Sequence, residues 1–126
     1  VSLAAGLATM ELLTREAIER LNSAGERLRA GLDQVFTDAG VPASFTGLGS
    51  LFGIHLTEGP VRTIRDAARA DALLRHRIFL GLYLEGILID PRGVGTLSTA
   101  IGDVEIEEFL DALRSVLSRL RQPALS

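Results

Sequence analysis

The stretch that decides the fold is Gly47-Leu-Gly-Ser-Leu-Phe-Gly-Ile-His-Leu-Thr57. From Phe52 onward, large apolar side chains alternate with glycine, histidine and threonine. This period of two is typical of a half-buried strand, so we expect a strand over residues 50–57. A shorter extended run at 44–46 precedes the glycine turn at 47–49. Two strands joined by a glycine turn predict an antiparallel hairpin.

Two long helices are expected on either side of this hairpin. In the first, apolar residues step by three or four from Ala17 to Val35, Thr14 is a suitable N-cap, and Gly40 marks the end. The second begins around Asp103, with glutamates in its first turns. Its apolar residues, which predict one buried face, are Ile106, Phe109, Leu110, Leu113, Val116, Leu117 and Leu120.

The remaining elements have weaker patterns. We expect a helix over 3–13, a third long helix from Asp66 to Gly86, a strand at 87–89 buried on both faces, and a strand at 96–99. The tail from Gln122 is expected to fray. Strands and helices follow one another without strict alternation, which predicts an α+β fold with a small antiparallel sheet covered by helices.

Composition excludes several classes of function. The 126 residues suit one domain, and net charge is −3 without a basic stripe, which argues against nucleic-acid binding. Cysteine is absent, which excludes disulfides, thiolate zinc sites and a cysteine nucleophile and suits a cytoplasmic protein. No membrane span or signal peptide is expected. All 13 basic residues are arginine, so no lysine can form a Schiff base.

Few residues offer site chemistry. His55 and His76 stand alone without carboxylates at ligand spacing, so we expect no metal site and interpret both as structural or surface residues. The Gly47–Ser50 turn precedes a strand, unlike a phosphate-binding loop, and is interpreted as a hairpin turn. Arg92, on a glycine-rich loop, could clamp a carboxylate with two parallel hydrogen bonds, or could equally form a surface ion pair.

Five segments, in order and with similar spacings, resemble class III pyridoxal-phosphate (PLP) aminotransferases. Residues 3–13 resemble the helix after the "GNP" turn of that family, and residues 47–57 resemble the small-domain hairpin of its glutamate-1-semialdehyde aminomutase branch. The match continues through residues 86–93, 97–99 and 103–113. The aminomutases carry a longer loop with a glutamate after the proline, whereas this chain has Arg92-Gly-Val-Gly95, which leaves aminotransferase specificity open.

This resemblance implies a larger, dimeric enzyme whose cofactor, PLP, is bound upstream. Residues 1–13 would then link from a missing large domain, and residues 14–126 would form the small C-terminal domain that closes over the active site. Gly49, Ser50 and Arg92 would be the substrate-side candidates, facing an amino-acid or amino-ketone substrate. No catalytic or cofactor-binding residue is implied within this chain, which would be inactive alone.

Two alternatives remain open on the residues alone. A stand-alone binding or interaction domain, which kept the fold and lost the chemistry, would expose no large apolar patch. A hydrolase using serine and histidine is weaker, because Gly49-Ser50-Leu51 does not match the nucleophile pattern G-x-S-x-G. If the chain is instead a domain without its partner, we expect the apolar helix at 3–13 to be exposed and to drive self-association.

Overall fold

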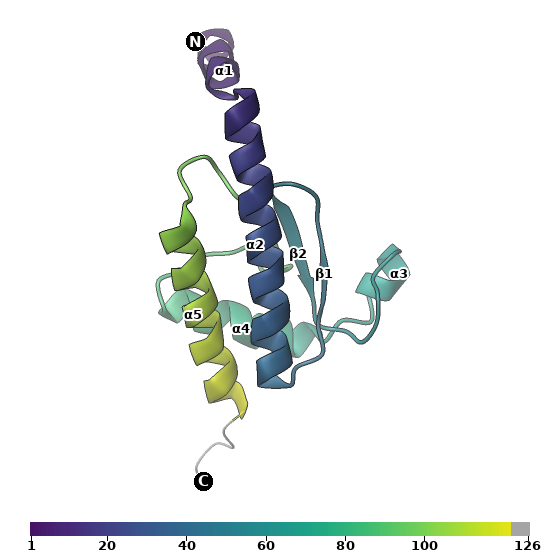
Figure 1. Cartoon of the computed structure of the whole chain (residues 1–126). Coiled ribbons are helices and arrows are strands. Elements are labelled where there is room, and N and C mark those ends of the chain that lie inside the picture. The colour runs from purple at the N-terminus through teal and green to yellow at the C-terminus, as the bar shows by residue number, and fades with distance from the viewer. Residues whose placement is uncertain (122–126) are drawn as a thin grey trace.

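The computed structural model describes residues 1–121 and consists of helices packed on a small sheet (Figure 1). The elements in chain order are α1 (Ser2–Leu12), α2 (Arg15–Ala39), β1 (Ser44–Thr46), β2 (Leu51–His55), α3 (Ile64–Ala67), α4 (Ala72–Leu84), β3 (Val94–Thr96) and α5 (Asp103–Arg121). The sheet is antiparallel with order β1-β2-β3, so β2 is central. The α+β prediction and the hairpin at its centre are confirmed.

One hydrophobic core lies between the helices and the sheet. Helices α2 and α5 lie side by side, and α4 packs against α5 (Figure 1). The most deeply buried large side chains come from these three helices: Leu28, Leu32, Val35, Phe36, Leu82, Leu113, Val116 and Leu117. The sheet contributes Phe52 and Ile54 from β2, the large apolar residues that the sequence places on one face, although Gly53 between them is buried as well.

Helix α2 begins and ends where the sequence predicts. The Thr14 hydroxyl accepts a hydrogen bond from the backbone N–H of Ala17 at 3.2 Å, which satisfies one of the donors left free at a helix start. Gly40 closes the helix in the left-handed conformation with φ of 62°, which glycine adopts without a Cβ clash.

Glycines allow α5 to approach both neighbouring helices closely. A Cβ at Gly31 of α2 would lie 2.4 Å from Leu110 Cδ1, and a Cβ at Gly81 of α4 would lie 2.6 Å from Val116 Cγ1. Both distances are shorter than any tolerated carbon–carbon contact. The side chains of Leu110 and Val116 therefore fill space that any larger residue at 31 or 81 would need.

The single helix predicted over 66–86 is wrong, because a new N-cap at Asp71 divides this segment into α3, which begins before it, and α4. Thr63 starts α3 with a capping box, in which its hydroxyl accepts from Asp66 N–H and the Asp66 carboxylate accepts from Thr63 N–H. Asp71 then starts α4 by accepting from Leu74 N–H at 2.9 Å. Its own N–H donates to Leu56 O, which ties this second start to the end of β2.

The strands predicted after α4 also need correction. Residues 87–89 form no strand, and Leu88 is 74% exposed rather than buried. The edge of β2 is occupied instead by Val94–Thr96, two residues earlier than the predicted strand at 96–99. Gly95 makes this pairing possible, because a Cβ there would lie 2.4 Å from the ring of Phe52. The continuous apolar run at 87–89 predicted a buried strand, but apolar character alone does not indicate which segment pairs with β2.

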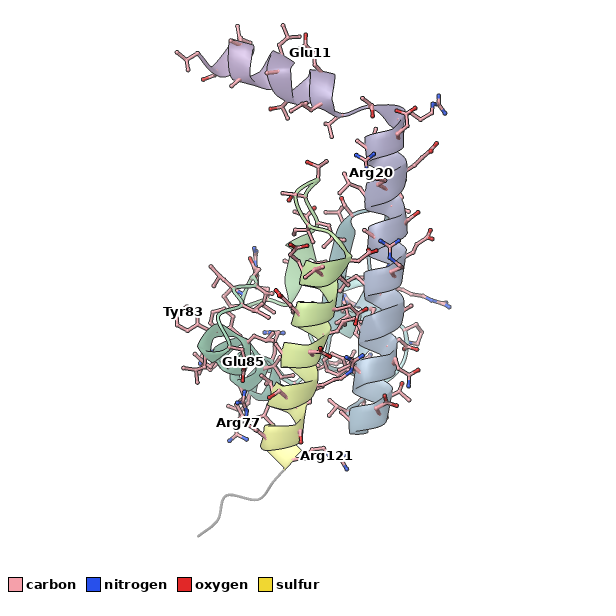
Figure 2. The ribbon with its side chains drawn as sticks, turned by 60° about the vertical axis from the view of Figure 1, so that its left-hand side comes forward. Glu11, Arg20, Arg77, Tyr83, Glu85 and Arg121 are labelled. Atoms are coloured by element: carbon pink, nitrogen blue, oxygen red, sulfur yellow. The ribbon has the colours of Figure 1, made fainter. Side chains whose placement is uncertain are left out.

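The first helix and the end of the last helix are exposed to solvent. Helix α1 stands clear of the remaining elements and buries no residue, with Leu3 91% exposed (Figure 2). The predicted exposure of this helix is confirmed. At the other end, α5 begins at Asp103 as predicted, whereas Leu120 is exposed rather than buried. The fraying predicted for the tail from Gln122 lies outside the described residues.

Candidate functional site

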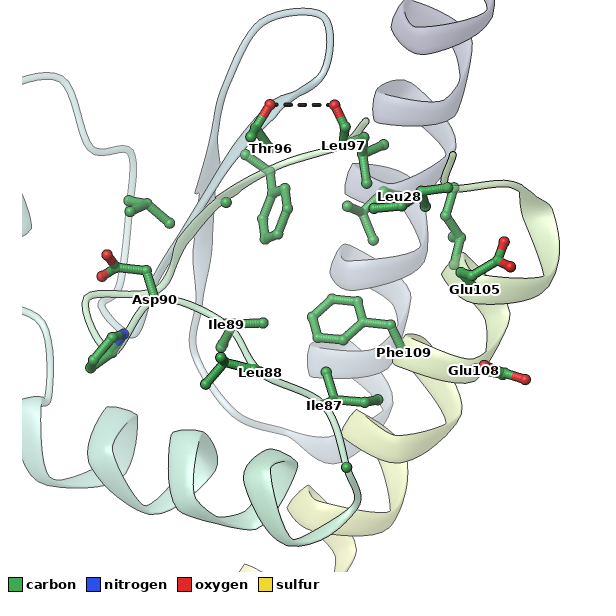
Figure 3. Close-up of a pocket in the computed structure, with 17 residues that line it drawn as sticks. Leu28, Ile87, Leu88, Ile89, Asp90, Thr96, Leu97, Glu105, Glu108 and Phe109 are labelled. Atoms are coloured by element: carbon green, nitrogen blue, oxygen red, sulfur yellow. Dashed lines mark hydrogen bonds between the residues drawn. The ribbon is translucent and has the colours of Figure 1, made fainter. Parts of the chain in front are cut away.

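An apolar groove runs between the segment 86–91, strand β3 and helix α5 (Figure 3). Its volume is about 810 Å³, which is the size of a small-molecule site. Apolar side chains dominate the walls, among them Phe52 and Phe109, whose ring centroids lie 6.3 Å apart. Asp90, before β3, and Thr96, the last residue of β3, both border the groove. Of the predicted site residues, Arg92 contacts Asp90 and Ser50 contacts Thr96.

Gly49 and Ser50 form a turn that helix α2 holds firmly. Arg29 donates from Nη1 to the backbone oxygens of Gly49, at 2.9 Å, and Leu51, at 3.0 Å. A Cβ at Gly25 would lie only 1.8 Å from Gly49 O, so the turn rests directly on the helix backbone. Gly49 itself has φ of 58°, which favours glycine. The position of this turn is therefore fixed by α2 as well as by the hairpin.

Ser50 faces β3 across the sheet edge. Its backbone oxygen accepts from Leu97 N–H at 2.9 Å, and its hydroxyl lies 3.4 Å from the hydroxyl of Thr96. Neither hydroxyl has a histidine or carboxylate partner among the described hydrogen bonds. The pair can donate and accept hydrogen bonds at the groove's edge, but it lacks the base that would activate a serine nucleophile.

Arg92 is held by a neighbouring acid. The Asp90 carboxylate accepts from Arg92 Nε at 2.9 Å, from Nη2 at 2.8 Å and from the Arg92 backbone N–H at 2.7 Å. These hydrogen bonds lower the pKa of Asp90 to about 2 and raise the pKa of Arg92. The guanidinium side chain remains 80% exposed. Its bidentate geometry is the one that a ligand carboxylate would adopt.

The two candidate regions lie at opposite ends of the β2–β3 pair. Leu51 pairs with Thr96 at the Ser50 end, whereas Ile54 N–H donates to Gly93 O at the Arg92 end. Ser50 and Arg92 are thus separated by the length of the paired strands. The groove borders both regions, through Thr96 at one end and Asp90 at the other.

The histidines contribute little to this arrangement. His55 Nε2 lies 2.8 Å from the Thr46 hydroxyl, and burial, followed by the charge of Arg75, lowers the pKa of His55. His76 stacks on Phe79 along α4, and Phe79 in turn stacks on Tyr83. Within residues 1–121, no three acidic or histidine side chains gather in a way that could hold a metal ion. In the same range, no helix is long and apolar enough to span a membrane.

Two residues of the site were missed from the sequence. Asp90 lies two residues before Arg92 across a proline, a spacing that signals an aspartate turn and could have been noticed. Arg29 has no predicted role in the site. Its contact with the turn 20 residues later depends on the tertiary fold, and no local pattern announces it.

Comparison with known proteins identifies similar chains. No family model matches. The chain is 38% identical over 118 residues to beta-phenylalanine transaminase of Variovorax paradoxus, covering 93% of the chain and 27% of that protein. It is 40% identical over 121 residues to glutamate-1-semialdehyde 2,1-aminomutase of Thermus thermophilus, covering 93% of the chain and 28% of that protein.

Solved structures agree with these sequence matches. An omega-transaminase from Sphaerobacter thermophilus superposes with a TM-score of 0.82 at 38% identity, covering 94% of this chain and 27% of that one. A transaminase with PLP bound gives the same TM-score and coverage at 30% identity. The chain therefore spans slightly more than a quarter of the length of the relatives it matches.

Proposed function

Because this chain is homologous to the C-terminal portion of class III PLP-dependent aminotransferases and aminomutases, we propose that it supplies the small domain that closes over the active site of such an enzyme. The observation that carries this proposal is the agreement of sequence and fold over 93–94% of the chain. The missing large domain, a dimeric state and a cytoplasmic location are parts of the same proposal.

The residues of this chain do not fit a complete PLP site. PLP supplies an electron sink for amino-group transfer, and enzymes hold it through a lysine amine. This chain has no lysine, and arginine cannot replace it because the guanidinium stays protonated. The cofactor would therefore be bound by the large domain, and the chain by itself would be inactive as an aminotransferase.

Within this proposal, Arg92 binds the carboxylate of the substrate. Its guanidinium is exposed, and its Nε and Nη2 already form a two-point contact with a carboxylate, that of Asp90. The groove beside it would receive apolar parts of the substrate or of the large domain. Gly49 and Ser50 would form the other substrate-side edge, where the Ser50 hydroxyl can orient a polar group.

Exposed apolar surface favours a domain over a stand-alone binding protein. Helix α1 carries a single charged residue, Glu11, and presents Leu3, Leu7 and Met10 to solvent. Helix α4 carries Arg75, His76 and Arg77 in its first half, but its second half leaves the large apolar side chains of Leu80, Tyr83 and Leu84 exposed. Tyr83 points outward from the helix in Figure 2. Exposed apolar side chains gathered in this way mark interaction surfaces, so a second surface is expected to cover each of the two helices.

The isolated chain should self-associate through α1. Analytical ultracentrifugation of the chain, and of a variant that starts at Thr14, measures this directly. We expect concentration-dependent oligomers that the truncation removes. A clean monomer of the whole chain over a wide concentration range would contradict the expected role of α1.

The test of the function joins this chain to the part it lacks. The preceding three quarters of the Variovorax transaminase would be fused to this chain at the matched boundary, and transamination of beta-phenylalanine measured. We expect activity from the fusion and none from either part alone. Arg92→Ala should raise KM for this substrate at least tenfold, whereas Arg77→Ala on the exposed face of α4 should not. A folded, PLP-loaded but inactive fusion would count against the proposal.

A further inference from the structure

In the proposed function, Arg92 binds the substrate carboxylate, whereas its ion-pair partner Asp90 has no role. We propose that Asp90 is an internal competitor, whose carboxylate occupies the Arg92 guanidinium until a ligand carboxylate displaces it. This inference rests on the proposed function of Arg92 and concerns the same site. It makes Asp90 a positioning residue that sets how readily carboxylates bind.

The geometry of the pair carries the inference. Asp90 uses Oδ1 for Arg92 Nε and the backbone N–H, and Oδ2 for Nη2, so both oxygens engage the Nε–Nη2 edge of the guanidinium. That edge provides the pair of parallel donors that a ligand carboxylate would need for a bidentate contact. A ligand cannot form this contact on that edge while Asp90 holds it.

The surroundings make the displacement feasible. Arg92 is 80% exposed and Asp90 31% exposed, so water and ligands reach the pair. Exposed ion pairs are worth little, which means that another carboxylate can compete. Arg75 lines the same small cavity as Asp90 and Gly93. Within the described chain Arg75 forms no ion pair, so a displaced Asp90 carboxylate has a second cation nearby.

The local backbone keeps the competitor in place. The Asp90 carboxylate accepts from Arg92 N–H, which fixes an aspartate turn across Pro91. Gly93 N–H donates to Asp90 O at 2.8 Å, and Gly93 O accepts from Ile54 N–H at 2.7 Å. The backbone of Asp90 is thereby linked to β2 through Gly93, whereas the Arg92 guanidinium is held by the Asp90 carboxylate. Displacement would free the arginine without unfolding the loop.

The test follows the arginine directly by NMR. In the chain labelled with ¹⁵N-arginine, the Nε–H signal of Arg92 is identified by its loss in Arg92→Lys. The probe is 3-phenylpropanoate, and the uncharged 3-phenylpropanamide is its control. Asp90→Asn and Asp90→Ala remove the competing charge, and Asp90→Glu retains a carboxylate. Backbone amide spectra verify that each variant is folded.

We expect both charge-removing variants to bind the carboxylate about two- to fivefold more tightly than the native chain, with Asp90→Glu closer to native. Equal affinity in native and Asp90→Asn chains would overturn the role of Asp90 and leave the Arg92 clamp intact. Absence of an Arg92 response in every variant would overturn the clamp, and the competitor with it. A response to the amide equal to that of the acid would also overturn both.

Discussion

The two ends of the β2–β3 pair are built differently. At the Ser50 end, the turn is held by a helix from outside the hairpin, through the two hydrogen bonds of Arg29 and the close approach at Gly25. At the Arg92 end, the guanidinium is held by a neighbour two residues away and remains exposed. Long-range support fixes one end as part of the fold, whereas local support leaves the other able to respond to a ligand. Substitutions should therefore affect stability at the first end and binding at the second.

The largest effect is expected at Gly25. In Gly25→Ala the new Cβ would meet Gly49 O, so the turn must move away from α2. Overpacking of this kind costs about 1–3 kcal/mol, partly offset by the higher helix propensity of alanine, worth about 0.5–1 kcal/mol. We expect a net loss in the free energy of unfolding, measured by urea denaturation. Gly6→Ala in α1, where a Cβ meets nothing, is the control. Equal stability of native and Gly25→Ala chains would contradict close packing at this turn.

A smaller loss is expected from Arg29→Ala. Two backbone oxygens of the turn lose their donor, which should cost about 1 kcal/mol in urea denaturation. The matched control is Arg27→Ala on the same helix, which breaks only an exposed pair with Asp103 and should cost under about 0.5 kcal/mol. Similar losses for the two variants would mean that the turn does not depend on the hydrogen bonds of Arg29.

At the opposite end, His55 should make stability depend on pH. Its pKa is lowered by burial and by Arg75, so protonation favours the unfolded chain, in which histidine has its ordinary pKa of 6.5. The native chain should therefore lose stability as pH falls below about 6.5. Thermal midpoints at pH 7.5 and pH 5.5 measure this loss, which should shrink in His55→Gln. An identical pH profile for the variant would assign the dependence to other groups.

The smallest effect on stability is expected from Asp90→Asn. The Arg92 side chain is 80% exposed and that of Asp90 31%, so solvent screens the pair, and the loss of stability at pH 7 should be smaller than in Arg29→Ala. The native pair should persist under acid, because the pKa of Asp90 is about 2. Carboxyl ¹³C shifts measured between pH 5 and pH 2 report this titration. A midpoint near the ordinary value of 3.8 would show that the pair is absent in solution.

The same contrast between local and long-range determinants explains what the sequence could predict. Helix α2 was predicted from cap to cap because Thr14, Gly40 and its apolar stripe are all local signals. The hairpin followed from alternation around Phe52 for the same reason. The helix division at Asp71 was missed because apolar spacing continued across it, although its cap signal was present in the sequence.

The local pattern of apolar residues could not predict which segment pairs with the second edge of β2. Residues 87–89 are the most apolar candidate strand, yet Val94–Thr96 pairs with β2 because Gly95 accommodates the Phe52 ring. At the site, Arg92 was recognised from its loop, and Gly49 and Ser50 from their turn. Their separation along the strands and the contact from Arg29 required the folded structure. The roles of Gly49, Ser50 and Arg92 in substrate binding remain predictions.

The glycines that flank α5 have a consequence for how this sequence can change. Gly31 faces Leu110 and Gly81 faces Val116, so each pair shares one fixed volume. A larger residue at either glycine position requires the facing side chain to shift or to become smaller. Across related sequences, residue size at 31 should therefore vary inversely with size at 110, and size at 81 inversely with size at 116. Engineered repacking of this domain would have to change both members of a pair together.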